Sequence, residues 1–390
     1  MKKIIGVLLT VTMIFALVGC AGNNVRSRDG LPQSTRIDRE TVAASSRALI
    51  PTAAATPRPA ATPAPVAAAT PAPVPAGETV SFQLHTQTDE THPLTIGLFE
   101  FKKEVENRSN GALLVDVSFG AGNDMDLRNR VINNELDAAV ITIWSVWQDL
   151  TDYANLESLP FLFGSYEEAW AAYDGELGAW VTRNVIEPHG ARVLGYWTNG
   201  LRHFTNNTRP IETPDDLRGL RMRSMQTTTH LAMYETFGAA SMSMPFGQVH
   251  EALATGRVDG QDNPLGNIHA ARLYEVQEYL TLSAHMYSCA PLIVSVEFWE
   301  SLTAEHQQIL LDASLVAARF QGELTKQVEE QQLAEIKAFG TKVNTVDAAP
   351  FKAAVEPIWE EHIERFGNEF VVMAARYVED SNALVRRFSE

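Results

Sequence analysis

The alternation of strand-like and helix-like segments near residue 100 constrains the fold of this chain more than any other feature. "TVSFQLHT" alternates apolar and polar residues with period two, whereas "GLFEFKKEVENRSNG" has the apolar spacing of a helix that ends at Gly111. "ALLVDVSF", "DLRNRVINNEL" and the apolar "DAAVITI" continue as strand, helix and buried strand. A helix between two strands returns the chain in the same direction, so this order predicts parallel strands in an α/β domain. The segments are residues 79–86, 97–111, 112–119, 126–136 and 137–143.

A second series of elements follows in the next part of the chain. "ARVLGYW" and "GLRMR" are strand-like, while "TTTHLAMYETFG" and "FGQVHEALATG" are helix-like and end at Gly238 and Gly256. Residues 304–340 predict one long helix or two. Residues 78–390 are long enough for one large domain or two smaller ones.

The N-terminus predicts export. Lys2 and Lys3 precede an apolar run that ends at Cys20, as in a secretory signal peptide. A single membrane anchor is the alternative, but the run is shorter than the roughly 20 residues that a spanning helix needs. "LVGC" (17–20) resembles the bacterial lipobox, which implies a signal peptide over 1–19 and a lipid on Cys20. The folded part would then lie outside the cytoplasm, facing the periplasm or the cell exterior, and Cys289 would be a small buried apolar residue.

Residues 20–77 are rich in Ala, Pro and Thr and lack the large apolar side chains of a core. They predict an extended spacer between the membrane and the folded domain, with a glycosylated stalk as the alternative. Eight Lys or Arg and three acidic residues lie in 1–77, so the remainder of this −17 chain carries a net charge of −22. This charge disfavours nucleic acid or an anionic membrane surface as a partner of the folded domain.

No enzyme motif in the sequence is complete. His250-Glu251 begins H-E-x-x-H, but Ala254 replaces the second histidine, so no zinc site is predicted. The start of a dinucleotide fingerprint near residue 120 has Met125 in place of its third glycine. We therefore predict no catalytic residues, no metal and no cofactor, although a pair of carboxylates for glycoside hydrolysis stays open.

Arginine and amide groups in the second half of the chain indicate a binding site instead. Arg202 follows the turn signal Asn199-Gly200, and Arg221 and Arg223 lie on the same side of a predicted strand. Arg223, at the strand's end, suits a carboxylate because its planar fork donates two parallel hydrogen bonds. A surface arginine is the alternative. In "VDGQDNP" (258–264), Asp-Gly and the proline predict a rigid turn.

Long segments of the sequence resemble the DctP-type substrate-binding proteins of tripartite ATP-independent periplasmic (TRAP) transporters. The resemblance covers residues 82–370 and is carried by "LESLPFLF", "GYWTNGLRHFTNNTRPIETPDDLRGLRMR", "MPFGQVHEALATGRVDGQDNPLGNI", "YEVQEYLTLSAHMYS" and "SLTAEHQQIL". It implies a two-lobed, type II-like periplasmic binding protein fold with a long helix spanning both lobes. It also implies that Arg223 forms a bidentate salt bridge with a ligand carboxylate, that Asn263 hydrogen-bonds the same ligand, and that Arg202 adds a polar contact.

Two segments depart from the family's pattern. At the cleft rim, where relatives often have Gly-Gln-Leu-Gly before an acidic-Arg pair, this chain has "GAGNDMDLR". "TIWSVW" follows the third strand, at a position where relatives vary with their ligand. Trp144 and Trp197 are predicted ligand contacts, with packing in the core as the alternative for Trp144 and Trp147.

The resemblance implies a receptor that passes a small carboxylate, such as a C4-dicarboxylate or a uronate, to the small and large membrane subunits of a TRAP permease. The predicted lobe 1 comprises 78–200 and 290–328, and lobe 2 comprises 201–289 and the helices of 329–390. A ligand-presenting subunit of a signalling system and a cell-surface hydrolase are the alternatives.

Overall fold

The computed structural model describes residues 79–390, apart from residues 121, 143, 380 and 381. The predicted signal peptide, Cys20 and the spacer of 20–77 lie outside the described residues. Within the described part, none of the helices combines the length and the apolar character that crossing a membrane requires.

The first lobe contains the predicted parallel sheet. Strand β1 pairs in parallel with β2 on one side and with β3 on the other. Helices α2 and α3 connect these strands, which confirms the predicted β-α-β-α-β order. The elements are β1 (Val80–Thr86), α2 (Pro93–Arg108), β2 (Leu113–Phe119), α3 (Asp124–Ile132) and β3 (Ala138–Val140).

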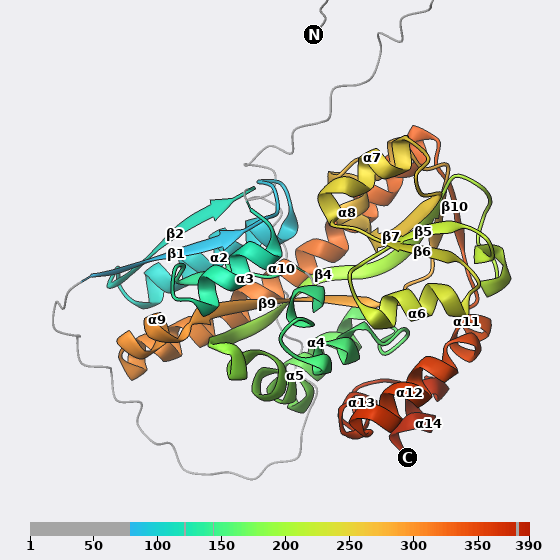
Figure 1. The fold of residues 1–390 in the computed structure, drawn as a ribbon. Coiled ribbons are helices and arrows are strands. Elements are labelled where there is room, and N and C mark those ends of the chain that lie inside the picture. Colours follow the sequence, from blue (N-terminus) through green and yellow to red (C-terminus); the bar gives the residue numbers. More distant parts are fainter. Residues whose placement is uncertain (1–78, 121, 143, 380–381) are drawn as a thin grey trace, which may run out of the picture. The chain divides into compact units, whose positions relative to one another are not determined.

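Two long strands and one long helix connect the lobes. Strand β4 (Ala191–Asn206) pairs antiparallel with β9 (Tyr287–Ser295), and β9 also pairs with β3 of lobe 1. Helix α10 (Ala304–Phe339) is continuous, and it packs against α2 in lobe 1, against β4 and against α8 (Leu265–Ala270) in lobe 2. Figure 1 shows it running behind both lobes. This confirms the predicted two-lobed fold with a spanning helix.

The predicted turn at Asn199-Gly200 is wrong, because these residues lie inside β4. The pairing register with β9 shifts between Thr198 and Gly200, so the strand carries a bulge there. Gly200 has a φ of 139°, and a Cβ at this position would lie 2.7 Å from Cβ of Pro264. A bulge thus uses the glycine that the sequence pattern assigned to a turn.

Lobe 2 continues the same sheet in the order β4-β7-β5-β6. Strand β8 pairs with the end of β4 and with β10 at the edge. The strands are β5 (Arg221–Ser224), β6 (Ala240–Ser243), β7 (Gly260–Pro264), β8 (Tyr279–Leu282) and β10 (Lys342–Thr345). The helices are α6 (Thr228–Thr236), α7 (Val249–Ala254) and α8.

The segment "VDGQDNP" is not a turn, and this corrects a second prediction. Residues 260–264 form the central strand β7, which pairs antiparallel with β4 and parallel with β5. Gly260 has no positive φ. Only a glycine fits at this position, because a Cβ there would lie 2.3 Å from the carbonyl oxygen of Thr205 and 2.9 Å from Sδ of Met222. Close approach of the two neighbouring strands, rather than a tight turn, explains the glycine.

Short helices complete the fold. The C-terminal helices pack against α5 in the first half of the chain, where the rings of Trp180 and Phe370 lie 5.4 Å apart, and Nε1 of Trp359 donates to the carbonyl oxygen of Pro160 at 3.1 Å. Cys289 is fully buried in the core, as predicted. The lobe boundaries proposed at residues 200 and 328 fall inside β4 and α10 and stay predictions.

The remaining α-helices are α4 (Tyr166–Tyr173), α5 (Glu176–Val181), α9 (Val296–Ser301), α11 (Ala349–Ala354), α12 (Glu356–Phe366), α13 (Glu369–Ala375) and α14 (Ala383–Ser389). The 3-10 and π-helical turns are η1 (Trp144–Trp147), η2 (Asp152–Ser158), η3 (Thr182–Ile186), η4 (Glu187–His189), η5 (Pro214–Leu217), η6 (Phe246–Gln248) and η7 (Leu273–Glu275).

Candidate ligand-binding site

Arg223 is a buried cation at the end of β5. Arg223 is only 3% exposed, and its Nε and Nη2 both donate to the carbonyl oxygen of Met244, at 3.1 and 2.9 Å. Burial, followed by the charge of Arg202, lowers the pKa of Arg223 to about 10. The guanidinium therefore stays charged at neutral pH. Among the described residues, no carboxylate bonds to it, which makes it suited to a ligand anion.

The alternation of β5 puts Arg221 and Arg223 on one side of the strand and Met222 on the other. Met222 is fully buried in the core on the opposite side of the strand. Arg221 lies at the surface, where its Nη2 is 2.6 Å from Oδ1 of Asp259. The two arginines of the strand thus have different roles: Arg221 has an acidic partner and Arg223 has only a main-chain one.

Arg202 lies on β4 and is held by Asp262 of β7. Its Nε is 2.6 Å from Oδ2 of Asp262, and its Nη2 donates to the main-chain carbonyl of the same residue. Both side chains are at most 1% exposed. Burial alone would raise the pKa of Asp262, but Arg202 and His230 hold it well below its usual range. Nη1 of Arg202 is buried and has no partner among the described residues.

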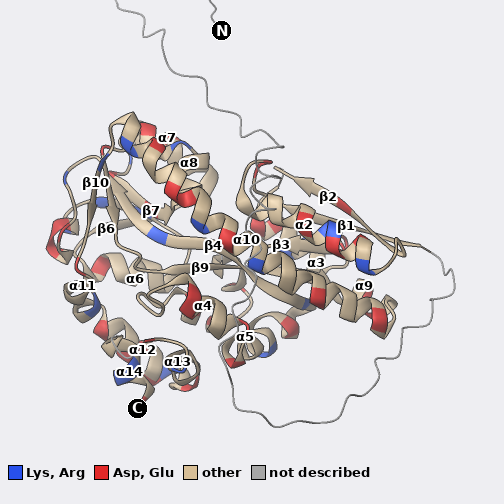
Figure 2. Ribbon diagram, turned by 180° about the vertical axis from the view of Figure 1, so that it is seen from behind, with Lys and Arg blue, Asp and Glu red and all other residues tan. Residues whose placement is uncertain are grey.

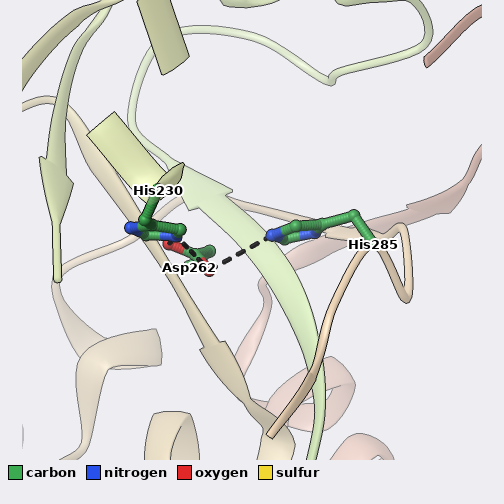
Figure 3. Close-up of side chains that lie close together, drawn as sticks. All are labelled: His230, Asp262 and His285. Carbon is green, nitrogen blue, oxygen red and sulfur yellow. Dashed lines mark hydrogen bonds and ion pairs between the residues drawn. The ribbon is translucent and has the colours of Figure 1, made fainter. Parts of the chain in front are cut away.

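His230, Asp262 and His285 form the cluster drawn in Figure 3, and their ligand atoms lie within 4.8 Å of one another. Such a group could hold a metal ion by residue type. Here, however, Nδ1 of His230 accepts from the main-chain N–H of Met225 at 3.0 Å, so its Nε2 carries the proton and donates to Asp262. Arg202 adds a positive charge on the same carboxylate. The geometry thus fits a support for Arg202 and disfavours a cation.

Tyr234 completes the set of donors around Asp262, since its hydroxyl donates to Oδ1 at 2.7 Å. Nε2 of His285 lies 3.2 Å from Oδ2. Burial lowers the pKa of both His230 and His285, so both rings are neutral at neutral pH. The donors around this carboxylate come from β4, from α6 and from the segment between β8 and β9, and together they fix the position of Arg202.

Asn263 is buried on the other face of β7. It lies opposite His203 in the β4–β7 register, and its Nδ2 donates to Oε1 of Gln261. Its Oδ1 accepts from Nδ2 of Asn267 at 3.4 Å. Because Met222 lies opposite Gly260, the following residue of β5, Arg223, shares the sheet face of Asn263. The structure therefore brings Arg223 and Asn263 to one face, whereas Arg202 with Asp262 occupies the other.

Lobe 1 approaches this site through His92. Its Nδ1 accepts from the main-chain N–H of Leu94 at 3.2 Å and caps α2. Its Nε2 therefore carries the proton and lies 3.3 Å from Oδ1 of Asn267. One hydrogen-bonded chain thus runs from lobe 1 through Asn267 to Asn263, and the strand ends of the two lobes face each other.

Polar groups follow the strands of lobe 1 at this edge. Nε2 of Gln87, directly after β1, donates to Oδ2 of Asp124 at 2.6 Å and to Oγ1 of Thr142 at 2.7 Å. Burial raises the pKa of Asp124 to about 7. Asn199 donates to the carbonyl oxygen of Thr142 at 3.0 Å, and its own Oδ1 is buried without a partner among the described residues.

Gln87, Asp124, Thr142 and Asp262 were not among the residues predicted for the site. A usable signal existed, because Gln87 and Thr142 follow β1 and β3, and ligands of open α/β sheets bind at the carboxyl ends of the strands.

Two of the predicted tryptophan contacts have different environments. Trp144 stacks on Tyr196, with ring centroids 6.5 Å apart, and its buried Nε1 has no partner among the described residues. Trp197 is fully buried against Phe101, and its Nε1 donates to Oγ of Ser314 at 3.2 Å. Trp197 is therefore a core residue, contrary to its predicted ligand role. These contacts place its side chain against α2 and α10.

Two α/β lobes joined by crossing strands and a spanning helix, with a buried, unmatched guanidinium at facing strand ends, define the class of two-lobed solute-binding proteins. The chain belongs to one family of this class: residues 84–365 match the model of the bacterial extracellular solute-binding proteins, family 7 (DctP). This confirms the resemblance seen in the sequence.

Individual relatives agree with this assignment. The chain is 30% identical over 288 residues to the 2,3-diketo-L-gulonate-binding periplasmic protein YiaO of Escherichia coli (strain K12), covering 72% of this chain and 85% of that protein. It is similar to the crystal structure of the sugar acid binding protein DctPAm of Advenella mimigardefordensis strain DPN7T in complex with galactonate (TM-score 0.71, 26% identity, 80% and 99% coverage). It is also similar to a TRAP periplasmic solute-binding protein of Sulfurospirillum deleyianum DSM 6946 with bound succinate (TM-score 0.70, 26% identity, 77% and 100% coverage).

Proposed function

We propose that this solute-binding protein is an extracytoplasmic receptor for a small organic acid, whose carboxylate binds Arg223. The observation that carries the proposal is the state of this side chain: it is buried and charged, and among the described residues it bonds only to the carbonyl of Met244. A buried charge without a counterion is costly, so a ligand carboxylate offers it a strong partner. The similar structures with galactonate and succinate contain ligands of this chemistry.

Asn263 and Arg202 are the further ligand contacts in this proposal. Asn263 shares the sheet face of Arg223 and supplies an amide beside it. Arg202 offers its unpaired Nη1 while Asp262 holds the rest of its guanidinium. Trp144 offers its unpaired Nε1 and a ring face from lobe 1. The rigidity of the Asp262 cluster reduces the side-chain entropy that ligand binding would otherwise lose.

Lobe closure couples binding to transport in this proposal. Groups of both lobes contact the ligand only when the lobes approach each other, so the ligand shifts the population toward the closed form. The hydrogen bond between Nε2 of His92 and Oδ1 of Asn267 joins the two lobes, and opening of the lobes would break it in this proposal. The closed receptor then delivers the acid to the small and large membrane subunits of a TRAP permease. No reaction and no cofactor are involved.

The anchoring of the receptor rests on the sequence. We propose that Cys20 carries the lipid, that residues 20–77 hold the folded domain away from the membrane, and that the lipid is its only membrane attachment. The net charge supports the absence of a nucleic-acid partner. Figure 2 shows acidic residues on helices of both lobes, with Lys and Arg interspersed rather than gathered in one basic patch.

Thermal unfolding of the full chain against a panel of organic acids tests the proposal. Ligand at a thousandfold excess over its Kd stabilises the folded state by about 4 kcal/mol, which a melting curve resolves. The shift should disappear in Arg223→Ala and persist in Arg221→Ala, the matched control on the same strand whose side chain bonds Asp259 instead. A shift that survives in Arg223→Ala, or no shift with any acid, would reject the carboxylate role of Arg223.

A further inference from the structure

The positive charges around the site are already matched, with one exception. Arg202 is neutralised by Asp262, and Arg128 of lobe 1 is neutralised by Asp149. Arg223 bonds only a main-chain carbonyl, so it is the single cation of the described site whose charge has no acidic partner. A second arginine is present beside the site, but its charge is not available to a second ligand carboxylate.

The facing groups of lobe 1 provide no second cation. Gln87, Thr142 and Asn199 are neutral, and they bond to one another, to Ser288 or to Asp124. Among the described residues, no lysine or arginine bonds to any of these groups. A second carboxylate on the ligand would therefore enter a buried surface that offers amides, hydroxyls and another acid. Burying an unpaired carboxylate is far more costly than burying a hydroxyl that finds a partner.

The unpaired polar atoms of the site indicate what the remainder of the ligand carries. Oδ1 of Asn199 is a buried acceptor and Nε1 of Trp144 is a buried donor, and neither has a partner among the described residues. A hydroxyl group donates and accepts, but a carboxylate only accepts. Hydroxyl groups on the ligand can satisfy both the acceptor of Asn199 and the donor of Trp144, whereas a carboxylate can satisfy only the donor.

We propose that the site selects an acid with one carboxylate and several hydroxyl groups, an aldonate or a uronate, over a dicarboxylate. The proposal rests on the proposed function, because it assumes that Arg223 binds the carboxylate. Asn199 and its neighbours in lobe 1 then bind the hydroxylated end.

A matched set of ligands isolates charge from shape. D-galactonate and D-galactarate have the same carbon chain and the same inner hydroxyl groups but carry one and two carboxylates, D-galactose carries none, and succinate has two carboxylates without hydroxyls. Calorimetric titration of the full chain measures each Kd. We expect galactonate to bind at least about tenfold more tightly than galactarate, succinate or galactose. Burying one unpaired charge, or losing one ion pair, each raises the Kd by more than about tenfold.

The variant Asn199→Leu tests the hydroxyl side of the argument. It removes the unpaired acceptor while keeping the size of the side chain. It also removes the hydrogen bonds from Nδ2 to Thr142 and Ser288, but that loss is the same for every ligand. We expect the affinity for galactonate to fall about tenfold more than the affinity for succinate. An equal loss for both ligands would overturn the assignment of Asn199 to hydroxyl binding.

The outcomes separate this inference from the proposed function. Galactarate or succinate binding as tightly as galactonate, with all binding lost in Arg223→Ala, would overturn the selectivity and leave the carboxylate receptor in place. Binding that does not depend on Arg223 would overturn both. Preference for galactonate together with loss in Arg223→Ala would support both.

Discussion

Replacing Asp262 by Asn tests the buried cluster that supports the site. The substitution keeps the shape of the side chain but removes the counterion of Arg202, whose side chain is 1% exposed. It also places an amide N–H₂ among donors, since His230, His285 and Arg202 all approach this carboxylate. Breaking a buried ion pair by removing one partner costs about 3–5 kcal/mol. Because the new amide donor also faces other donors, we expect the free energy of unfolding to fall by an amount in the upper part of that range.

Urea denaturation measures this loss, and the structure offers a matched control. Asp259→Asn removes the partner of Arg221, whose side chain is 50% exposed, so that variant should lose only about 0–1 kcal/mol. The pair Arg202→Met with Asp262→Leu should recover most of the stability, because no unpaired charge remains buried. A loss below about 1 kcal/mol in Asp262→Asn would refute the reasoning, since a buried charge cannot lose its counterion so cheaply.

The same variant has a pH signature. The pKa of Asp262 is lowered in the folded state, so its stabilising contribution is fully present above its ordinary value of 3.8 and is lost as the pH falls toward the folded value. Asp262→Asn should therefore have a flatter loss of stability below about pH 4 than the parent chain. An unchanged slope in acid would contradict the ion pair.

Other predictions follow from single positions. Burial raises the pKa of Glu157 to about 8, so the free energy of unfolding falls as the pH rises from about 5 toward that value. In Glu157→Gln this fall should be smaller by up to about 1.4 kcal/mol per pH unit, as measured by denaturation between pH 5 and 8. Gly260→Ala should cost about 2 kcal/mol or more, because the new Cβ would lie 2.3 Å from the Thr205 carbonyl oxygen; a neutral effect would contradict the strand geometry. Trp197→Ala should lower the free energy of unfolding by about 3–5 kcal/mol and leave the Kd for the ligand unchanged, whereas the reverse pattern would restore its ligand role.

Much of the fold is readable from local patterns. The strands and helices of lobe 1, the long helix α10 and the glycines that follow α6 and α7 were all predictable, because periodicity and helix-ending residues depend on a few neighbouring positions. The segments "NG" and "VDGQDNP" were misread for the same reason. Locally both are turn signals, but both lie in strands. Gly200 has a positive φ at a bulge and faces the side chain of Pro264, whereas Gly260 lies where the backbone of β4 approaches closely.

The candidate site divides in the same way. The sequence by itself determined an α/β chain of the DctP type and drew attention to Arg202, Arg223 and Asn263, since residue type and motif carry that information. Only the tertiary structure decided that Asp262 neutralises Arg202, that Arg223 has no acidic partner in the described part of the chain and that Trp197 belongs to the core. Charge balance and burial depend on which side chains meet across strands distant in sequence, and no local pattern encodes those meetings.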